Sequence, residues 1–263
     1  MINLVSFIAA AALILFIEPY IYNEYYCNDS IFSGNFSDND SVFIYPQYEF
    51  IEPDIPWSYM ISNFPHILQG DEYPTGCEAV STVMVLNYIG IDITIDEFID
   101  EYLPKMDTYA EGEGDDRIIY AADPNEYFVG DPYDEHSLGC YAPVIKKALD
   151  NYSTELYTAT DITGTDMKDI IRKYTLNDIP VIFWATMDMK PSKEGTEWKI
   201  IDSDREFTWI SPEHCLVLIG YDNKSYYFSD PSKEESITSY SRKTVEKRFE
   251  ELGKQGVVIQ LVH

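Results

Sequence analysis

One segment constrains the fold more than any other, because it predicts a helix that must be buried on most of its sides. From Cys77 to Ile89 the residues are apolar nearly all round a helix, with Ala79, Val80 and the run from Val83 to Leu86 spread over its faces. Gly90 follows where a helix usually stops. A helix of this kind needs covering layers on more than one side, so the domain must fold around it.

The remaining patterns predict helices in the first half of the domain and strands in the second. Thr94 and Glu97 have the spacing of a capping box for a helix that ends by Leu103. Two further helices are expected, one from Pro143 onwards and one capped by Thr165 that runs to about residue 174. Short β-rich runs follow at 180–186, 214–221 and 225–228, then a helix over about 242–252 and a last strand over 257–262. Helices followed by antiparallel strands predict an α+β fold.

Cys77 stands at the start of the buried helix, directly after the turn-like residues 73–76. Free N–H groups and the positive end of the helix dipole stabilise a thiolate at such a position. The sequence therefore predicts a nucleophilic cysteine whose thiol pKa is lowered. The alternative is that Cys77 is only a small core residue.

Three other residues have the chemistry and the order that a cysteine nucleophile needs. His214 begins a strand, and Asp230 lies sixteen residues on (230 − 214), at the end of the next strand. A hairpin of that length brings its ends together, so Asp230 is expected to orient His214 as a base for Cys77. Gln69, eight residues before Cys77 (77 − 69), can donate to an oxyanion. Taken singly, His214 also fits a structural role and Gln69 a solvated loop.

Several segments together resemble papain-like cysteine peptidases related to the bacteriocin leader peptidases that cut after a double glycine, known as cysteine peptidase family thirty-nine, in its stand-alone branch. The resemblance covers about Pro65 to the C-terminus. It is carried by the segments 69–81 (QGDEYPTGCEAVS), 139–143 (GCYAP), 180–186 (PVIFWAT), 214–222 (HCLVLIGYD) and 230–231 (DP).

The resemblance implies a papain-like fold and a Cys-His-Asp site with a Gln-assisted oxyanion hole. Cys77 would attack a peptide carbonyl, His214 would act as base and then acid, Asp230 would orient His214, and Gln69 would help to bind the oxyanion. Leader peptidases are usually fused to a transporter with an ATPase, but no Walker motif occurs here, so the substrate stays open. Two alternatives remain: a cell-wall amidase or transpeptidase that uses the same site, and a catalytically silent domain that binds peptides.

The strong net negative charge limits the classes of molecule that the protein can bind. The chain has 46 acidic and 18 basic residues, a net charge of −28, which repels phosphate backbones and anionic lipid headgroups. Nucleic acid is therefore not expected as a partner. A peptide or protein substrate is, and we expect a monomer with no cofactor.

The N-terminus predicts contact with a membrane. Residues 2–17 carry no charge and are apolar except for Asn3 and Ser6, which suits a signal sequence or a short anchor. We therefore divide the chain into a signal sequence or membrane anchor at 1–22, a linker at 23–52 and a peptidase domain at 53–263. The domain is expected outside the cytoplasm, either membrane-anchored or secreted.

Three other cysteines and an acidic stretch need an interpretation. In an oxidising compartment Cys140 and Cys215 could form a disulfide, and Cys27 would then have no cysteine to pair with. Without that disulfide, Cys140 and Cys215 are free thiols. A zinc site that combines them with His66 or His136 is not expected, since no CxxC or HxxxH pair occurs. Residues 107–135 are acidic and read as a solvated loop rather than a calcium site, because no EF-hand pattern is present.

Overall fold

The computed structural model describes residues 55–152 and 157–262. The chain divides into two units, Met1–Glu52 and Pro53–His263, and only the second contains described residues. The predicted anchor and linker thus lie outside the described part of the chain. Within the described ranges, no helix combines the length and apolar character that crossing a bilayer requires.

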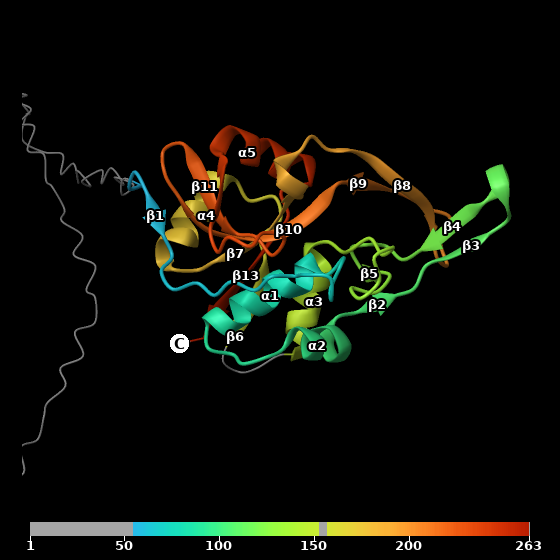
Figure 1. The fold of residues 1–263 in the computed structure, drawn as a ribbon, viewed down its shortest axis with the longest axis horizontal. Helices are drawn as coiled ribbons and strands as arrows, with labels where there is room; N and C mark the ends of the chain where they lie inside the picture. The colour runs from blue at the N-terminus through green and yellow to red at the C-terminus, as the bar shows by residue number, and fades with distance from the viewer. Residues whose placement is uncertain (1–54, 153–156, 263) are drawn as a thin grey trace, which may run out of the picture. The chain divides into compact units, whose positions relative to one another are not determined.

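A seven-stranded sheet, antiparallel at every pairing, forms the centre of the domain (Figure 1). Its strand order is β12 (Thr238–Ser241), β11 (Ser225–Ser229), β10 (Glu213–Tyr221), β7 (Val181–Thr186), β13 (Gly256–Leu261) and β6 (Tyr157–Asp161), and β1 (Tyr59–Met60) also pairs with β10. The four strands predicted from sequence are β7, β10, β11 and β13, so the α+β prediction is confirmed.

Helices cover both faces of this sheet, and alternating residues of β7 show which helices lie on which face. Ile182 and Trp184 belong to the same buried cluster as α1 (Cys77–Tyr88) and α3 (Ala142–Tyr152). Phe183 belongs to the second cluster, with α4 (Met167–Lys173) and α5 (Arg242–Glu251). The period of two along the strand therefore divides the core into two layers. In the first layer both helices pack on the sheet, α1 against β10 and β7, and α3 against β6 and β13.

Most predicted helix ends are found, with one error. α1 ends as expected, since Gly90 has a φ of +88°. Thr94 accepts a hydrogen bond from the Glu97 N–H, and α2 (Ile95–Glu97) continues as a π-helical turn over Phe98–Tyr102. The prediction that Thr165 caps α4 is wrong, because the N-cap residue is Asp166.

The prediction that residues 107–135 are a loop is also wrong in part. Two strands from this stretch, β3 (Tyr109–Glu111) and β4 (Ile118–Ala121), join β8 (Lys193–Ile200) and β9 (Glu206–Ser211) in a four-stranded sheet. Two short parallel strands, β2 (Lys105–Met106) and β5 (Phe128–Val129), lie between this sheet and α1 in Figure 1. Trp198 and Trp209 are buried in the second sheet, and Trp209 stacks on Tyr141 with ring centroids 5.0 Å apart. The Trp198 indole N–H donates to the Ala122 carbonyl at 3.0 Å and so ties the end of this stretch to the core, while β3 stays exposed.

Candidate active site

Cys77 is the first residue of α1, and the turn before it fixes that position. The Gly76 N–H donates to the Tyr73 carbonyl at 3.0 Å, which closes the turn. A Cβ on Gly76 would lie 3.0 Å from the Tyr73 Cβ, so a larger residue would push the turn apart. Only 7% of Cys77 is exposed. The sequence prediction of its place at a helix start is confirmed.

His214 and Asp230 come together across the hairpin of β10 and β11. His214 Nε2 lies 2.7 Å from Asp230 Oδ1, and both side chains are buried. Asp230 also accepts bonds from the backbone N–H of Ser232 at 3.0 Å and from its hydroxyl at 2.8 Å, an Asx-turn arrangement. Burial alone would raise the pKa of Asp230, but the bonds from His214 and Ser232 hold it below its ordinary value. Asp230 is therefore a carboxylate fixed against one nitrogen of His214.

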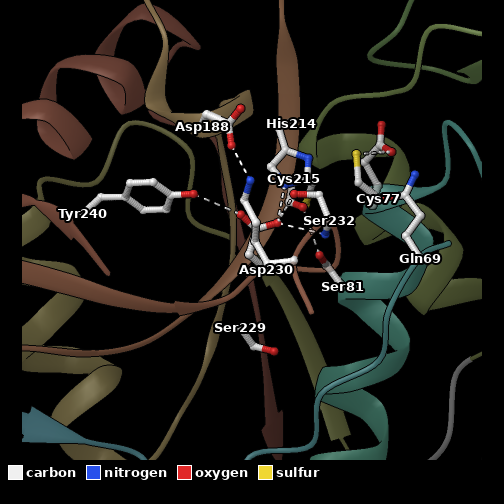
Figure 2. A network of polar contacts seen from close by, with 12 residues as sticks. Gln69, Cys77, Ser81, Asp188, His214, Cys215, Ser229, Asp230, Ser232 and Tyr240 are labelled. Carbon is white, nitrogen blue, oxygen red and sulfur yellow. Dashed lines mark hydrogen bonds and ion pairs between the residues drawn. The ribbon is translucent and has the colours of Figure 1, made fainter. Parts of the chain in front are cut away.

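The other nitrogen of His214, Nδ1, is buried and has no hydrogen-bond partner. Figure 2 shows His214 between Asp230 and Cys77, with Gln69 on the far side of Cys77. Since Nε2 faces Asp230, Nδ1 is the ring nitrogen left for the thiol. A buried ring nitrogen without a partner is costly, so its presence here calls for an explanation.

Gln69 is held close to Cys77 by its own neighbours. Its backbone N–H donates to the Pro231 carbonyl at 2.8 Å, so the loop that carries Gln69 is tied to the residue after Asp230. Its side-chain amide donates to the Tyr73 carbonyl at 2.5 Å. An amide nitrogen carries two hydrogens, so this bond orients the group and leaves a second donor free.

Two glutamates lie beside the thiol. Glu78 follows Cys77 on α1 and is fully buried: its Oε2 accepts from the Cys77 thiol at 3.2 Å, and its Oε1 accepts from the Cys140 N–H at 2.6 Å. Glu213 precedes His214 on β10, and its Oε1 is buried with no partner. Burial raises the pKa of Glu78 to about 7. Burial and the nearby Glu78 carboxyl raise the pKa of Glu213 well above its ordinary range.

These carboxyls overturn the prediction of a lowered thiol pKa. Burial, followed by the neighbouring carboxyls of Glu78 and Glu213, raises the pKa of Cys77. The stabilising effect of a helix start on a thiolate is outweighed, because a charged sulfur would be desolvated beside two acidic groups. In this geometry the Cys77 thiol donates to Glu78 Oε2, and no hydrogen bond joins it to Nδ1 of His214.

The other cysteines of the described chain are free. Cys140 and Cys215 are buried thiols with no disulfide between them, and burial raises the pKa of each. Cys27 lies outside the described residues. His66 is held by the Ser229 hydroxyl and the Lys233 carbonyl, at 3.0 and 2.9 Å, and has a structural role beside β11.

Sequence reasoning missed several residues of the site. Glu78, Glu213, Ser232 and Tyr240 were not singled out, although the Tyr240 hydroxyl donates to Asp230 Oδ2 at 3.3 Å. Ser232 carried a signal, because a serine two residues after an aspartate is typical of an Asx turn. The two glutamates are next to Cys77 and His214 in sequence, and that adjacency was the only signal for their proximity.

A cysteine on a buried helix, facing a histidine on an antiparallel sheet, defines the papain-like class of cysteine peptidase folds. The chain belongs to the peptidase C39-like family, whose model matches residues 61–257. The uncharacterized protein YvpB of Bacillus subtilis is 30% identical over 185 residues, which is 70% of this chain and 69% of YvpB. The crystal structure of a putative C39-like peptidase from Bacillus anthracis matches with a TM-score of 0.65 and 28% identity, covering 78% of this chain and 98% of that one. The family prediction made from sequence is thus confirmed.

Proposed function

We propose that this protein is a cysteine peptidase that hydrolyses peptide bonds through Cys77, His214 and Asp230, with Gln69 in the oxyanion hole. The observation that carries the proposal is the buried Nδ1 of His214, left without a partner while Nε2 is bound to Asp230. A purely structural histidine would satisfy both nitrogens when buried. Membership of a peptidase family supports the same reading.

The geometry supports a general-base mechanism. His214 Nδ1 takes the thiol proton as the sulfur attacks the carbonyl carbon, and the imidazolium that forms is stabilised by the Asp230 carboxylate. The oxyanion accepts from the free Gln69 amide hydrogen and from the Cys77 N–H. The imidazolium then protonates the leaving amine, and water attacks the thioester to release the acid and restore the thiol.

The place of action and the partners are part of the same proposal. We place the enzyme outside the cytoplasm, held or exported by the apolar residues 2–17, with a peptide or protein as substrate. A fusion of the N-terminal residues to a reporter that is active only outside the cytoplasm tests this placement. A reporter that stays inactive would contradict it.

Cys77→Ala is the direct test of the enzymatic role. With a peptide library read by mass spectrometry, we expect the wild type to release new termini and Cys77→Ala to release none, while both give the same circular dichroism and melting temperature. Cys27→Ala, which changes a cysteine of the predicted linker, is the matched control and should keep full activity. Hydrolysis by a folded Cys77→Ala variant would refute the proposal.

One observation favours a second candidate, a silent domain that binds peptides. The Cys77 thiol donates to Glu78 Oε2 and not to His214 Nδ1, which has no partner, so the hydrogen bond between nucleophile and base is absent. The same library separates the two functions: peptides that are retained by the wild type and by Cys77→Ala alike, with no cleavage in either, would support the binding domain.

A further inference from the structure

The side chains of Cys77, Glu78 and Glu213 form a set of donors that the peptidase mechanism does not use as a set. The thiol sulfur and one carboxylate oxygen from each glutamate all lie within 4.8 Å of one another. Asp230 is paired with His214, and Asp188 is paired with Lys190 and Lys233. The two glutamates instead face the thiol and each other.

Two buried atoms beside this set have no partner. Oε1 of Glu213 accepts no hydrogen bond, and neither does Nδ1 of His214, whose side chain is 1% exposed. Nδ1 lies on the side of the ring turned away from Asp230, and in Figure 2 the ring stands beside Cys77. An acidic pair with unsatisfied atoms in a buried place is costly unless a proton or a cation compensates its charge.

We propose that Cys77, Glu78 and Glu213 bind a divalent cation of the zinc class, and that this cation reversibly silences the nucleophile. The donor types select the ion. Sulfur together with carboxylate oxygen suits zinc or cobalt, whereas magnesium and calcium prefer oxygen alone. Three protein ligands leave one position of a tetrahedral site for water.

The spacing suits such an ion after small side-chain rotations. Zinc bonds of about 2.0–2.3 Å place neighbouring tetrahedral ligands roughly 3.3–3.8 Å apart. The donors start within 4.8 Å, and Glu78 is already fixed by the Cys140 N–H at 2.6 Å. Gly139 leaves the space for that carboxylate, because a Cβ there would lie 2.5 Å from Glu78 Oε1. The backbone around the set is therefore already arranged to hold one of its ligands.

Metal binding and catalysis compete for the same atoms. The ion displaces the thiol proton and any proton on the carboxyl pair, and these protons pass to solvent. The sulfur lone pair is then held by the metal and cannot attack a carbonyl. This inhibitory consequence rests on the proposed peptidase function, but the binding itself does not.

Cobalt(II) absorption on the full chain tests the site without any substrate. The protein is prepared without a histidine tag, treated with chelator and kept reduced with a phosphine. We expect cobalt to give a thiolate-to-metal charge-transfer band in the wild type and none in Cys77→Ser. Glu213→Gln should weaken binding by about tenfold or more, whereas Glu206→Gln, an exposed glutamate on β9, should bind like the wild type.

The outcomes separate this inference from the proposed function. A cobalt titration without the band, or a band that persists in Cys77→Ser, overturns the metal site and leaves a shared proton as the balancing charge. If the band forms as expected but no peptide is cleaved by the metal-free protein, the peptidase proposal fails alone. If peptides are cleaved and zinc at the concentration that saturates the site does not inhibit, the silencing role is refuted.

Discussion

At the scale of single residues, the side chains around Cys77 act on its proton in opposite directions. Burial, and after it the carboxyls of Glu78 and Glu213, raise the pKa of Cys77 and keep the proton on sulfur. His214, which is bound to Asp230, is the residue that we propose removes it. The places of Cys77, His214 and Asp230 at the ends of elements could be predicted from sequence, because turn residues and strand patterns mark those ends. Glu213 could not be paired with Glu78, since 135 positions (213 − 78) separate them.

Gln69→Ala tests the oxyanion role at this scale. The amide is a donor to the developing charge and has little contact with the ground state, so we expect kcat to fall by about 10²–10³ with a small change in KM. Steady-state kinetics on a cleaved library peptide give both constants. Gln260→Ala, at an exposed position of β13, is the matched control. A higher KM with an unchanged kcat would mean that Gln69 binds substrate and does not stabilise the oxyanion.

At the scale of elements, the site is assembled where α1 begins and where β10 and β11 meet. The helix and these strands were predictable, because one is apolar all round and the others are short β-rich runs with a turn between them. The sheet of β3, β4, β8 and β9 was not, because the acidic side chains of β3 and its flanks concealed the strand signal. The contact of Cys140 with Glu78 joins residues 62 positions apart (140 − 78), so it too could not be predicted from sequence.

Gly139→Ala tests the packing of this loop against α1. The residue has a φ of +134°, and an added Cβ would lie 2.5 Å from Glu78 Oε1. We expect a loss of roughly 2 kcal/mol or more in the free energy of unfolding, from strain and displaced Glu78 together. Gly164→Ala is the control, with a φ of +86° but open space around it, and should cost about 1 kcal/mol. Equal losses in chemical denaturation would show that the contact with Glu78 is not tight.

At the scale of the whole molecule, the buried carboxyl of Glu78 makes stability depend on pH. Its pKa rises from 4.5 to about 7 on folding. Below pH 4.5 both the folded and the unfolded states are protonated and nothing is lost. As pH rises towards 7, the unfolded state releases its proton first, so the folded state loses stability. The groups that face Glu78 are Cys77, Cys140, Glu213 and His214.

Glu78→Gln removes this pH dependence. Relative to the wild type, the variant should gain stability between pH 5 and pH 8, on the order of 3 kcal/mol from a pKa shift of this size. Urea denaturation in chelator at the two pH values measures the difference. If the free energies of unfolding of Glu78→Gln and the wild type differ by the same amount at pH 5 and pH 8, the raised pKa of Glu78 is contradicted. The lowered pKa of Asp230 does not interfere, because it is present in both proteins.

The most direct test of the central claim is the rate at which iodoacetamide labels each cysteine of the metal-free protein, read by peptide mass spectrometry across pH. If His214 is the base for Cys77, the wild type labels Cys77 near neutral pH much faster than the buried Cys140 and Cys215, and His214→Ala slows Cys77 by about 10²-fold. Equal Cys77 rates in the wild type and in His214→Ala would contradict the proposed pair.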